Sequence, residues 1–277
     1  MEFEFFDNSA KILNTVNFDL SQTFDCGQCF RWNKFENKFF GTVFGEFVSL
    51  KQNGTTIVIE NTNEEKFNLI WKNYFDLESD YKFMAERLFG IHPILDKAIR
   101  ECSGIRILKQ DPWEALCSFI ISQNNNIPRI KKIVNSLCVK FGENLADGIF
   151  AFPKPEVLAA CKEEDLASVR AGFRARYIID AAMKVSEGKL DFLELKNMPP
   201  EEASGVLMQI TGVGPKIAEC VRLYGLHDFR AFPIDVWMKK IMEKLFPENT
   251  PDVFGDFRGL AQQYLYHYIR FHPDIIA

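Results

Sequence analysis

The first third of the chain carries the hydrophobic pattern of a β-sheet. Residues 39–50 are rich in aromatic and β-branched side chains, and residues 55–60 form a second run of this type. The dipeptide Asn53-Gly54 separates the two runs, and it is the strongest short signal for a β-hairpin because both residues accept positive φ angles. We therefore expect an antiparallel meander, followed by helical structure over residues 64–90.

Beyond about residue 96 the apolar positions recur with the period of an α-helix. Asp111 before Pro112 marks the start of a helix to residue 121, because aspartate caps a first turn and proline fits its first position. Further helices are expected over residues 128–141, 163–169, 175–187, 200–209, 215–226, 235–245 and 256–268.

The two patterns together predict an α+β fold. An N-terminal antiparallel β-sheet domain is expected over residues 1–100, and an all-α body over residues 101–277. The body contains a helix–hairpin–helix motif within residues 200–226.

The composition is that of an ordinary globular protein, with 47% hydrophobic and 26% charged residues. The formal net charge of −5 argues weakly against a nucleic-acid partner. However, residues 97–140 hold eight Lys or Arg against three acids, a local net charge of +5. Binding depends on where charge lies rather than on its sum, although a solvated helix face would explain this segment equally well.

The cysteines and the chain's first residues indicate the compartment. The seven cysteines are an odd number, no stretch of 18 apolar residues occurs, and the first residues lack a secretory signal. We expect free thiols, no membrane contact and a cytoplasmic protein, nucleoid-associated in a bacterium or nuclear in a eukaryote. Cys26 and Cys29 have a CxxC spacing, but no second pair accompanies them, so no metal site is expected.

The hairpin between the helices of the motif suits a phosphate. Gly212 and Gly214 allow a tight turn and a close approach, and Pro215 fits the first helical position. The amides of Val213, Gly214 and Lys216 then lie at a helix N-terminus, where partial positive charge gathers. Glycine spacing alone leaves an ordinary helical hairpin as an alternative.

Lys216 is the candidate nucleophile. A cation in the first turn of a helix opposes the helix dipole, and an amine in this unusual position suits the role of a nucleophile that attacks carbon. Nineteen residues later, Asp235 is positioned to cap another helix. Its carboxylate can also orient the lysine or stabilise positive charge developing on a sugar.

At this point the chain resembles a known family. Residues 210–235 resemble the helix–hairpin–helix, Gly/Pro-rich, Asp motif (HhH-GPD) of base-excision DNA glycosylases, and are most similar to the 8-oxoguanine DNA glycosylases. Further similar blocks occur in order along the chain, at residues 26–32, 110–112, 118–129 and 172–177. The resemblance implies a bifunctional enzyme that flips 8-oxoguanine out of duplex DNA, excises it through a lysine Schiff base and nicks the strand by β-elimination.

The resemblance also assigns roles to single residues. Lys216 corresponds to the lysine that attacks C1′, and Asp235 to the catalytic aspartate. The backbone carbonyl of Gly27 corresponds to the acceptor for N7–H of 8-oxoguanine, a donor that guanine lacks. Cys220 and Tyr266 correspond to residues on the two faces of the flipped base, and Gln262 to the residue that bonds its Watson–Crick edge. Tyr266 replaces the family's phenylalanine.

A second group is expected at the opposite base. Asn124, Arg129 and Arg174 match residues that contact the orphaned cytosine or fill the vacated space, and Phe173 matches a wedge beside it. Phe173 replaces the family's usual tyrosine, but an apolar ring can still unstack bases. Trp237 stands where some relatives have a phosphate-contacting histidine, and it offers only an indole donor.

The resemblance sets the expected partners. These are double-stranded DNA containing 8-oxoguanine, with the protein acting as a monomer and requiring no cofactor. The family's hairpin can hold a cation through backbone carbonyls, here those of Met208, Ile210 and Val213, and the sequence leaves both an occupied and an empty hairpin open.

Three other functions compete with this one. Endonuclease III-like and adenine-removing glycosylases of the same superfamily carry a four-cysteine cluster after the aspartate, whereas this chain has no cysteine after Cys220. Alkylpurine glycosylases lack a catalytic lysine, so Lys216 argues against them. A non-catalytic DNA-gripping hairpin would explain Gly212 and Gly214 but not the lysine with its aspartate.

Overall fold

The computed structural model describes residues 1–248 and 250–276, and its N-terminal part is a six-stranded sheet. The order is β1-β2-β6-β5-β4-β3, and every neighbouring pair is antiparallel. The strands are β1 (Glu2–Phe6), β2 (Ser9–Leu13), β3 (Asn33–Phe35), β4 (Lys38–Val43), β5 (Glu46–Asn53) and β6 (Thr56–Glu60).

Two tight turns join β4, β5 and β6. Asn53 pairs with Thr56 across the β5–β6 turn, which confirms the hairpin predicted at Asn53-Gly54. The long aromatic run before it is broken at Phe44 and Gly45, which have φ angles of 50° and 81° and divide it into β4 and β5. The pattern alone did not show this break, because a phenylalanine with positive φ carries no turn signal.

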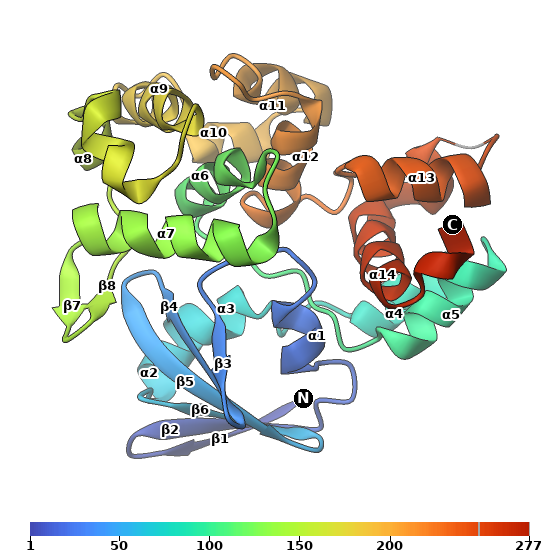
Figure 1. Cartoon of the computed structure of the whole chain (residues 1–277). Coiled ribbons are helices and arrows are strands. Elements are labelled where there is room, and N and C mark those ends of the chain that lie inside the picture. Colours follow the sequence, from blue (N-terminus) through green and yellow to red (C-terminus); the bar gives the residue numbers. More distant parts are fainter. Residues whose placement is uncertain (249, 277) are drawn as a thin grey trace.

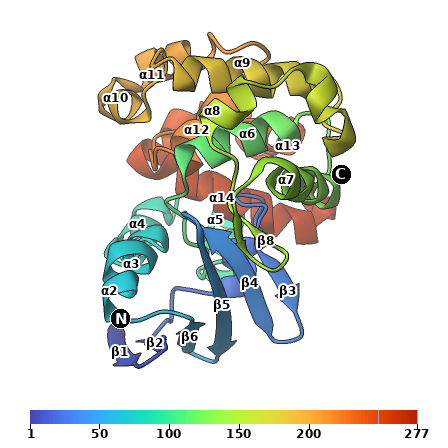
Figure 2. The same cartoon turned by 90° about the vertical axis from the view of Figure 1, so that its left-hand side faces the viewer.

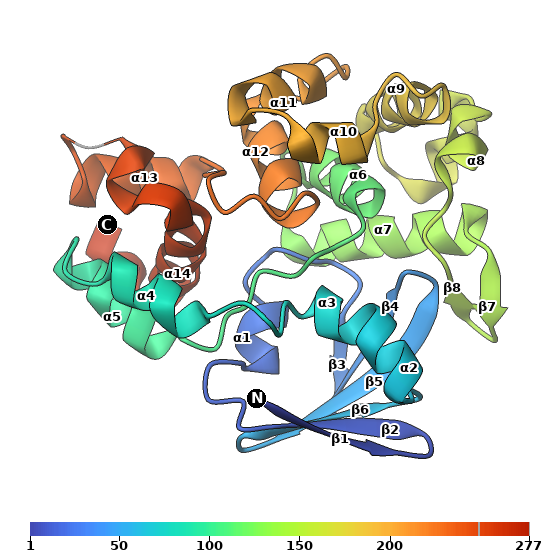
Figure 3. The ribbon, with the colours of Figure 1, turned by 180° about the vertical axis from the view of Figure 1, so that it is seen from behind.

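One face of the sheet is covered by the helical segment that follows it, α2 (Glu64–Lys66), the π-helical turn η1 (Phe67–Trp71) and α3 (Lys72–Tyr74). Phe67, Trp71 and Phe75 recur every four residues, lie on one side of this segment and are fully buried in the core of the sheet. Figure 3 shows α2 and α3 lying against the sheet.

The rest of the chain is largely helical, which confirms the α+β class. The helices are α1 (Leu20–Phe24), α4 (Tyr81–Leu88), α5 (Pro93–Glu101), α6 (Pro112–Ser122), α7 (Ile127–Phe141), α8 (Pro155–Ala159), η2 (Glu163–Val169), α9 (Arg174–Ser186), α10 (Phe192–Asn197), α11 (Pro200–Leu207), α12 (Pro215–Tyr224), α13 (Val236–Leu245), η3 (Pro251–Phe257), α14 (Arg258–Phe271) and η4 (Pro273–Ile276). In Figure 1 the helices from α6 to α12 form one group, and α13 and α14 lie beside α4 and α5.

Several details of the helical body differ from the sequence pattern, which predicted neither of the short helices α8 and α10. Residues 163–169 form a 3₁₀-helix rather than an α-helix. A small hairpin of β7 (Asn144–Ala146) and β8 (Ile149–Phe150) interrupts the body, so it is not all-α. Its turn is Asp147-Gly148, a hairpin dipeptide whose glycine has a φ angle of 73°.

The described residues form two hydrophobic cores. The sheet core runs to Leu77 and takes in Leu108, whereas the helical core begins at Tyr81 and also includes Cys26 and Phe30 from the N-terminal part. Figure 2 shows the sheet beneath the helical body. The loop with Cys26 and Phe30 thus joins the two parts, and the division at residue 100 stays a prediction. Among the described residues, no helix is both long and apolar enough to cross a membrane.

Candidate active site

A cavity of about 730 Å³ opens where α6, α12 and α14 meet the loop before α13 and the loop around Gly27. Its lining brings together residues from across the chain that the sequence nominated. These are Gly27, Asn124, Gly214, Lys216, Cys220, Asp235, Gln262 and Tyr266.

The side chain of Lys216 is held in this cavity by α6. Helix α12 starts at Pro215 with Gly214 as its N-cap, so Lys216 lies in the first turn as expected. Its Nζ donates a hydrogen bond to Oγ of Ser122 at 3.2 Å and lies 5.6 Å from the ring centre of Phe119. The amine is therefore fixed at the cavity wall rather than extended into solvent.

Asp235 caps α13, and its Oδ1 accepts a hydrogen bond from the amide of Met238 at 2.8 Å. The loop before it is tied to α12, because Oε2 of Glu219 accepts from the amide of Phe232 at 2.8 Å. Arg222 in turn holds Glu219 through an ion pair of 2.5 Å. The helix that carries the lysine therefore also positions the loop that carries the aspartate.

Gly27 reaches the cavity because the buried side chain of Gln28 fixes its loop. Nε2 of Gln28 donates to the backbone carbonyls of Thr23 and Arg106 at 2.9 and 2.8 Å, and its Oε1 accepts from the backbone N–H of Leu108 at 2.8 Å. Gly27 has a φ angle of 81°, which favours glycine, and a Cβ there would lie 3.4 Å from the ring of Tyr266.

Cys220 lies one turn after Lys216 and is almost completely buried. Burial raises the pKa of its thiol to about 11, although the nearby Lys216 acts to lower it. The thiol is therefore uncharged and offers an apolar surface on which an aromatic ring can stack. Tyr266 lines the same cavity, half-buried, and burial raises the pKa of its hydroxyl. Both side chains present apolar surface where the sequence expected a base to stack.

Gln262 is buried in the same cavity and hydrogen-bonded within the protein. Its Nε2 donates to the carbonyl of Pro233 at 3.4 Å, and its Oε1 accepts from Nε2 of Gln263 at 3.0 Å and from the Tyr224 hydroxyl at 3.5 Å. Its amide is therefore oriented before any base enters.

The residues expected at the opposite base lie at the edge of the cavity or outside it. Asn124 is exposed in a left-handed turn with a φ angle of 47°. Arg174 holds this turn from behind, since its guanidinium donates to the carbonyls of Gln123 and Asn124 and is buried. Arg129 lines a neighbouring surface hollow, and Phe173 is half-exposed 4.4 Å from the Arg174 guanidinium.

The hairpin is braced by α9. A Cβ on Gly212 would lie 2.3 Å from the ring of Tyr177, and the amide of Thr211 donates to Oδ2 of Asp180 at 2.7 Å. Val213 is buried behind the turn, whereas a Cβ on Gly214 would meet open space. The open side of the hairpin therefore leaves room for a phosphate at the start of α12.

Sequence reasoning did not single out several of these supporting residues. Ser122 and Tyr177 lie inside the blocks that resemble the family, so the sequence could have indicated that they lie near the site. No sequence signal pointed to Asp180 or Gln263. Asp180 contacts a residue 31 positions away, and Gln263 contacts its neighbour Gln262.

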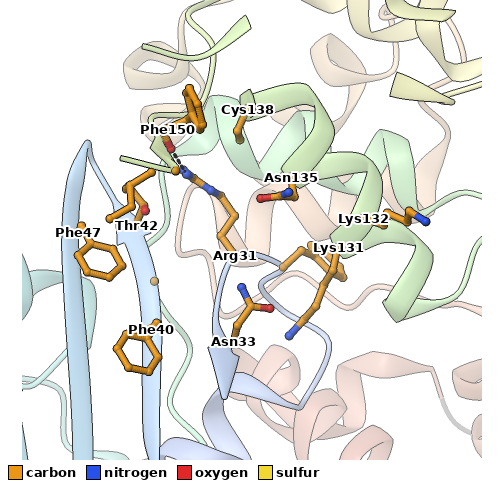
Figure 4. A pocket seen from close by; sticks show the side chains of 14 residues that line it. Arg31, Asn33, Phe40, Thr42, Phe47, Lys131, Lys132, Asn135, Cys138 and Phe150 are labelled. Carbon is orange, nitrogen blue, oxygen red and sulfur yellow. Dashed lines mark hydrogen bonds between the residues drawn. The ribbon is translucent and has the colours of Figure 1, made fainter. Parts of the chain in front are cut away.

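A second hollow, of about 430 Å³, lies between β4, β5, α7 and the β7–β8 hairpin (Figure 4). Arg31 crosses it, donating to the carbonyl of Phe150 and pairing with Glu114 at 3.3 Å, and Lys131 donates to the carbonyl of Trp32 at 2.6 Å. The charged groups of Arg31 and Lys131 therefore serve bonds within the protein. Within the described residues, no three His, Cys, Asp or Glu side chains are grouped to hold a metal ion.

Two family models match consecutive parts of the chain. The 8-oxoguanine DNA glycosylase N-terminal domain matches residues 11–116, and the HhH-GPD superfamily base excision DNA repair protein model matches residues 117–253. Together they span the sheet, the loop around Gly27, and the motif with Lys216 and Asp235.

Individual proteins are similar over most of their length. The N-glycosylase/DNA lyase of Saccharomyces cerevisiae is 34% identical over 263 residues, 84% of this chain and 69% of that protein. The 8-oxoguanine glycosylase/lyase of Clostridium acetobutylicum, in complex with double-stranded DNA containing cytosine opposite 8-oxoguanine, is 38% identical, covers 99% of each chain and has a TM-score of 0.91. MBOgg1 in complex with a low affinity DNA ligand is 43% identical, covers 99% of this chain and 100% of its own, and has a TM-score of 0.92.

Proposed function

The chain belongs to the 8-oxoguanine DNA glycosylases of the HhH-GPD superfamily, and we propose that Lys216 is the nucleophile with which it excises the damaged base. It is a bifunctional enzyme that removes 8-oxoguanine from DNA and cleaves the strand at the resulting abasic site. The observation that carries the proposed mechanism is the shared cavity of Lys216, Asp235, Cys220 and the Gly27 loop.

In the proposed reaction the nitrogen of Lys216 gives up a proton and attacks C1′ of the flipped nucleotide. The C1′–N9 bond breaks, and the base leaves with the bonding electrons and takes up a proton. Positive charge that develops on the sugar faces the carboxylate of Asp235, which is held by its own helix cap and needs no rearrangement. Asp235 is thus proposed to act electrostatically, because its carboxylate is already in place when the positive charge forms.

The covalent adduct then leads to strand cleavage. The sugar ring opens to give a Schiff base between its C1′ and the lysine nitrogen. Loss of a proton from C2′ expels the 3′-phosphate by β-elimination, and hydrolysis releases Lys216. Ser122 contacts the lysine nitrogen at 3.2 Å, so it is placed to steady this atom between the steps.

Selection of the base is proposed to rest on Gly27. Its carbonyl accepts N7–H of 8-oxoguanine, whereas guanine would place an acceptor against an acceptor, at a cost of about 1–3 kcal/mol. The bonds made by Gln28 support this role because they keep the loop from moving to relieve that mismatch. Cys220 and Tyr266 are proposed to cover the faces of the ring, with Gln262 on its Watson–Crick edge.

The DNA partner is proposed to be duplex containing 8-oxoguanine, bound by a monomer. Asn124, Arg129 and Arg174 would serve the orphaned cytosine, and Phe173 would wedge beside it, supported by the cation of Arg174 behind its ring. Arg174 would have to exchange some of its bonds to the 123–124 turn for bonds to the base.

The hairpin is proposed to contact phosphate through the amides of Val213 and Gly214, with Gly212 packed behind. No cofactor is proposed. A cation at the carbonyls of Met208, Ile210 and Val213 is compatible with the oxygen chemistry, since the Ile210 oxygen accepts one hydrogen bond, from Val213 at 3.0 Å, and keeps a second lone pair. It would neutralise the nearby phosphate.

Borohydride trapping on 8-oxoguanine duplex tests the proposed mechanism. Reduction of the Schiff base should give a covalent protein–DNA adduct with the natural chain and none with Lys216→Gln. The variant should still bind duplex, because the hairpin amides remain. An adduct of undiminished yield with Lys216→Gln would sink the assignment of the nucleophile.

A further inference from the structure

Gln263, the residue after the expected reader of the base edge, is a buried polar side chain that the mechanism above does not use. It is 1% exposed and lines the active-site cavity. Its Oε1 is buried without a hydrogen-bond partner. Burying an unpaired amide oxygen costs free energy that a leucine of similar size would avoid, so the amide is explained by what its nitrogen does.

That nitrogen makes the strongest contact of Gln262. Oε1 of Gln262 accepts from Nε2 of Gln263 at 3.0 Å, whereas its contact with the Tyr224 hydroxyl is 3.5 Å and that of its Nε2 with the carbonyl of Pro233 is 3.4 Å. Hydrogen bonds of this type usually measure 2.7–3.2 Å. Only the bond from Gln263 falls inside that range, so it dominates the orientation of the Gln262 amide.

Gln263 is itself firmly held. Its Nε2 has two hydrogens, and it donates the second hydrogen bond to the Tyr224 hydroxyl at 2.7 Å. The ring of Tyr224 stacks on Phe119, with ring centres 5.1 Å apart and planes 19° from parallel. Phe119 is the same residue over which Lys216 lies, so a rigid chain of contacts runs from α6 to the Gln262 amide.

We propose that Gln263 is a positioning residue that orients the Gln262 amide for recognition of 8-oxoguanine. An amide can turn by half a circle and exchange its oxygen with its nitrogen. The guanine edge requires that choice to be settled, because it carries donors at N1 and N2 beside an acceptor at O6. A donor fixed on one lone pair of Oε1 settles it, and the base would have to displace only the longer contact of the second lone pair, with the Tyr224 hydroxyl at 3.5 Å. The inference rests on the proposed function and refines how that site selects its substrate.

The test compares two reactions of the same enzyme. One is single-turnover excision of 8-oxoguanine opposite cytosine, and the other is strand cleavage at a preformed abasic site, which contains no base to recognise. Gln263→Leu should lower the ratio of excision to abasic-site cleavage about tenfold, the effect of losing one well-placed hydrogen bond. The matched control is Gln22→Leu, which also removes a doubly bonded amide, to Glu101 and Gly104, but lies outside the cavity.

A second variant separates positioning from packing. Gln263→Glu keeps the size and one oxygen but loses the N–H donor, so the ratio should fall at high pH. At lower pH the carboxyl becomes protonated and regains a donor. The ratio of excision to abasic-site cleavage should then recover, when it is divided by the ratio of the natural chain at the same pH. A structural role alone would not produce this recovery.

The outcomes distinguish the inference from the function beneath it. A natural chain that never excises 8-oxoguanine overturns the proposed function together with the inference. Excision by the natural chain with an unchanged ratio in Gln263→Leu, or an equal fall in Gln22→Leu, overturns the inference alone. Absence of pH-dependent recovery in Gln263→Glu also counts against the donor role.

Discussion

Nζ of Lys216 donates to Oγ of Ser122 at 3.2 Å, while the same hydroxyl donates to the carbonyl of Phe119 at 2.7 Å. The serine proton is committed to its own helix, so its oxygen is left as an acceptor for the lysine. Residues 94 positions apart thereby fix the amine at the wall of the cavity.

Ser122→Ala should slow excision without abolishing it. The lysine would lose the acceptor that limits its rotamers, a cost of about 1 kcal/mol or roughly fivefold in the single-turnover rate. Ser136→Ala is the control, because its hydroxyl bonds the carbonyl of Lys132 on α7 and has no lysine partner. An unchanged rate in Ser122→Ala would show that the lysine does not depend on this contact.

Local signals predicted the elements well but not the way they meet. Asn53-Gly54, and Asp111 before Pro112, specify a turn and a helix start through the conformations of a few neighbouring residues. Gly27 illustrates the limit. Its loop enters the cavity because Gln28 bonds residues 78 and 80 positions further along, and no local pattern encodes that contact. Its proposed role came from the family resemblance.

The two glutamines of α14 show a second limit. Gln262 and Gln263 are adjacent and chemically identical, and a helical period cannot say that both will line one cavity. Their different roles depend on Tyr224, which lies on another helix. The assignments of single residues at the DNA surface likewise remain predictions, since Arg174 is engaged within the protein here.

Gly27→Ala should reduce the preference for 8-oxoguanine over guanine. Alanine is strained at a φ angle of 81°, so the backbone is expected to relax and shift the carbonyl, while the new Cβ would only touch the ring of Tyr266 at 3.4 Å. Excision of 8-oxoguanine should fall roughly tenfold, for a displaced hydrogen bond worth about 1–3 kcal/mol.

A matched glycine separates strain from recognition. Gly45 has the same φ angle of 81° but lies in the β4–β5 turn with open space around it. Gly45→Ala should therefore lower stability by a similar amount and leave base preference unchanged. If Gly27→Ala keeps the preference of the natural chain in competition assays, the carbonyl of Gly27 is not the reader.

Stability should depend on pH through Glu114. Burial raises the pKa of this carboxyl to about 7 despite its ion pair with Arg31. A raised pKa means that the folded chain binds the proton more tightly than the unfolded chain. The stability that this proton contributes is therefore complete below the ordinary pKa of a carboxyl and is lost as the pH rises through about 7. As the pH rises from that ordinary pKa to neutrality, Glu114→Gln should lose less stability than the natural chain, measured by thermal unfolding. Parallel profiles would contradict the assignment.

The contact between the hairpin and α9, where Gly212 packs on the ring of Tyr177, can be tested by substitution. Gly212→Ala would place a Cβ 2.3 Å from the ring of Tyr177, so the ring or the hairpin would have to move. We expect a loss of about 1–3 kcal/mol of stability beyond the backbone strain, together with weaker duplex binding as the hairpin amides move. Gly188→Ala is the control for strain, with a φ angle of 70° and open surroundings. Equal melting temperatures and equal duplex affinities for the two variants would mean that Tyr177 does not position the hairpin.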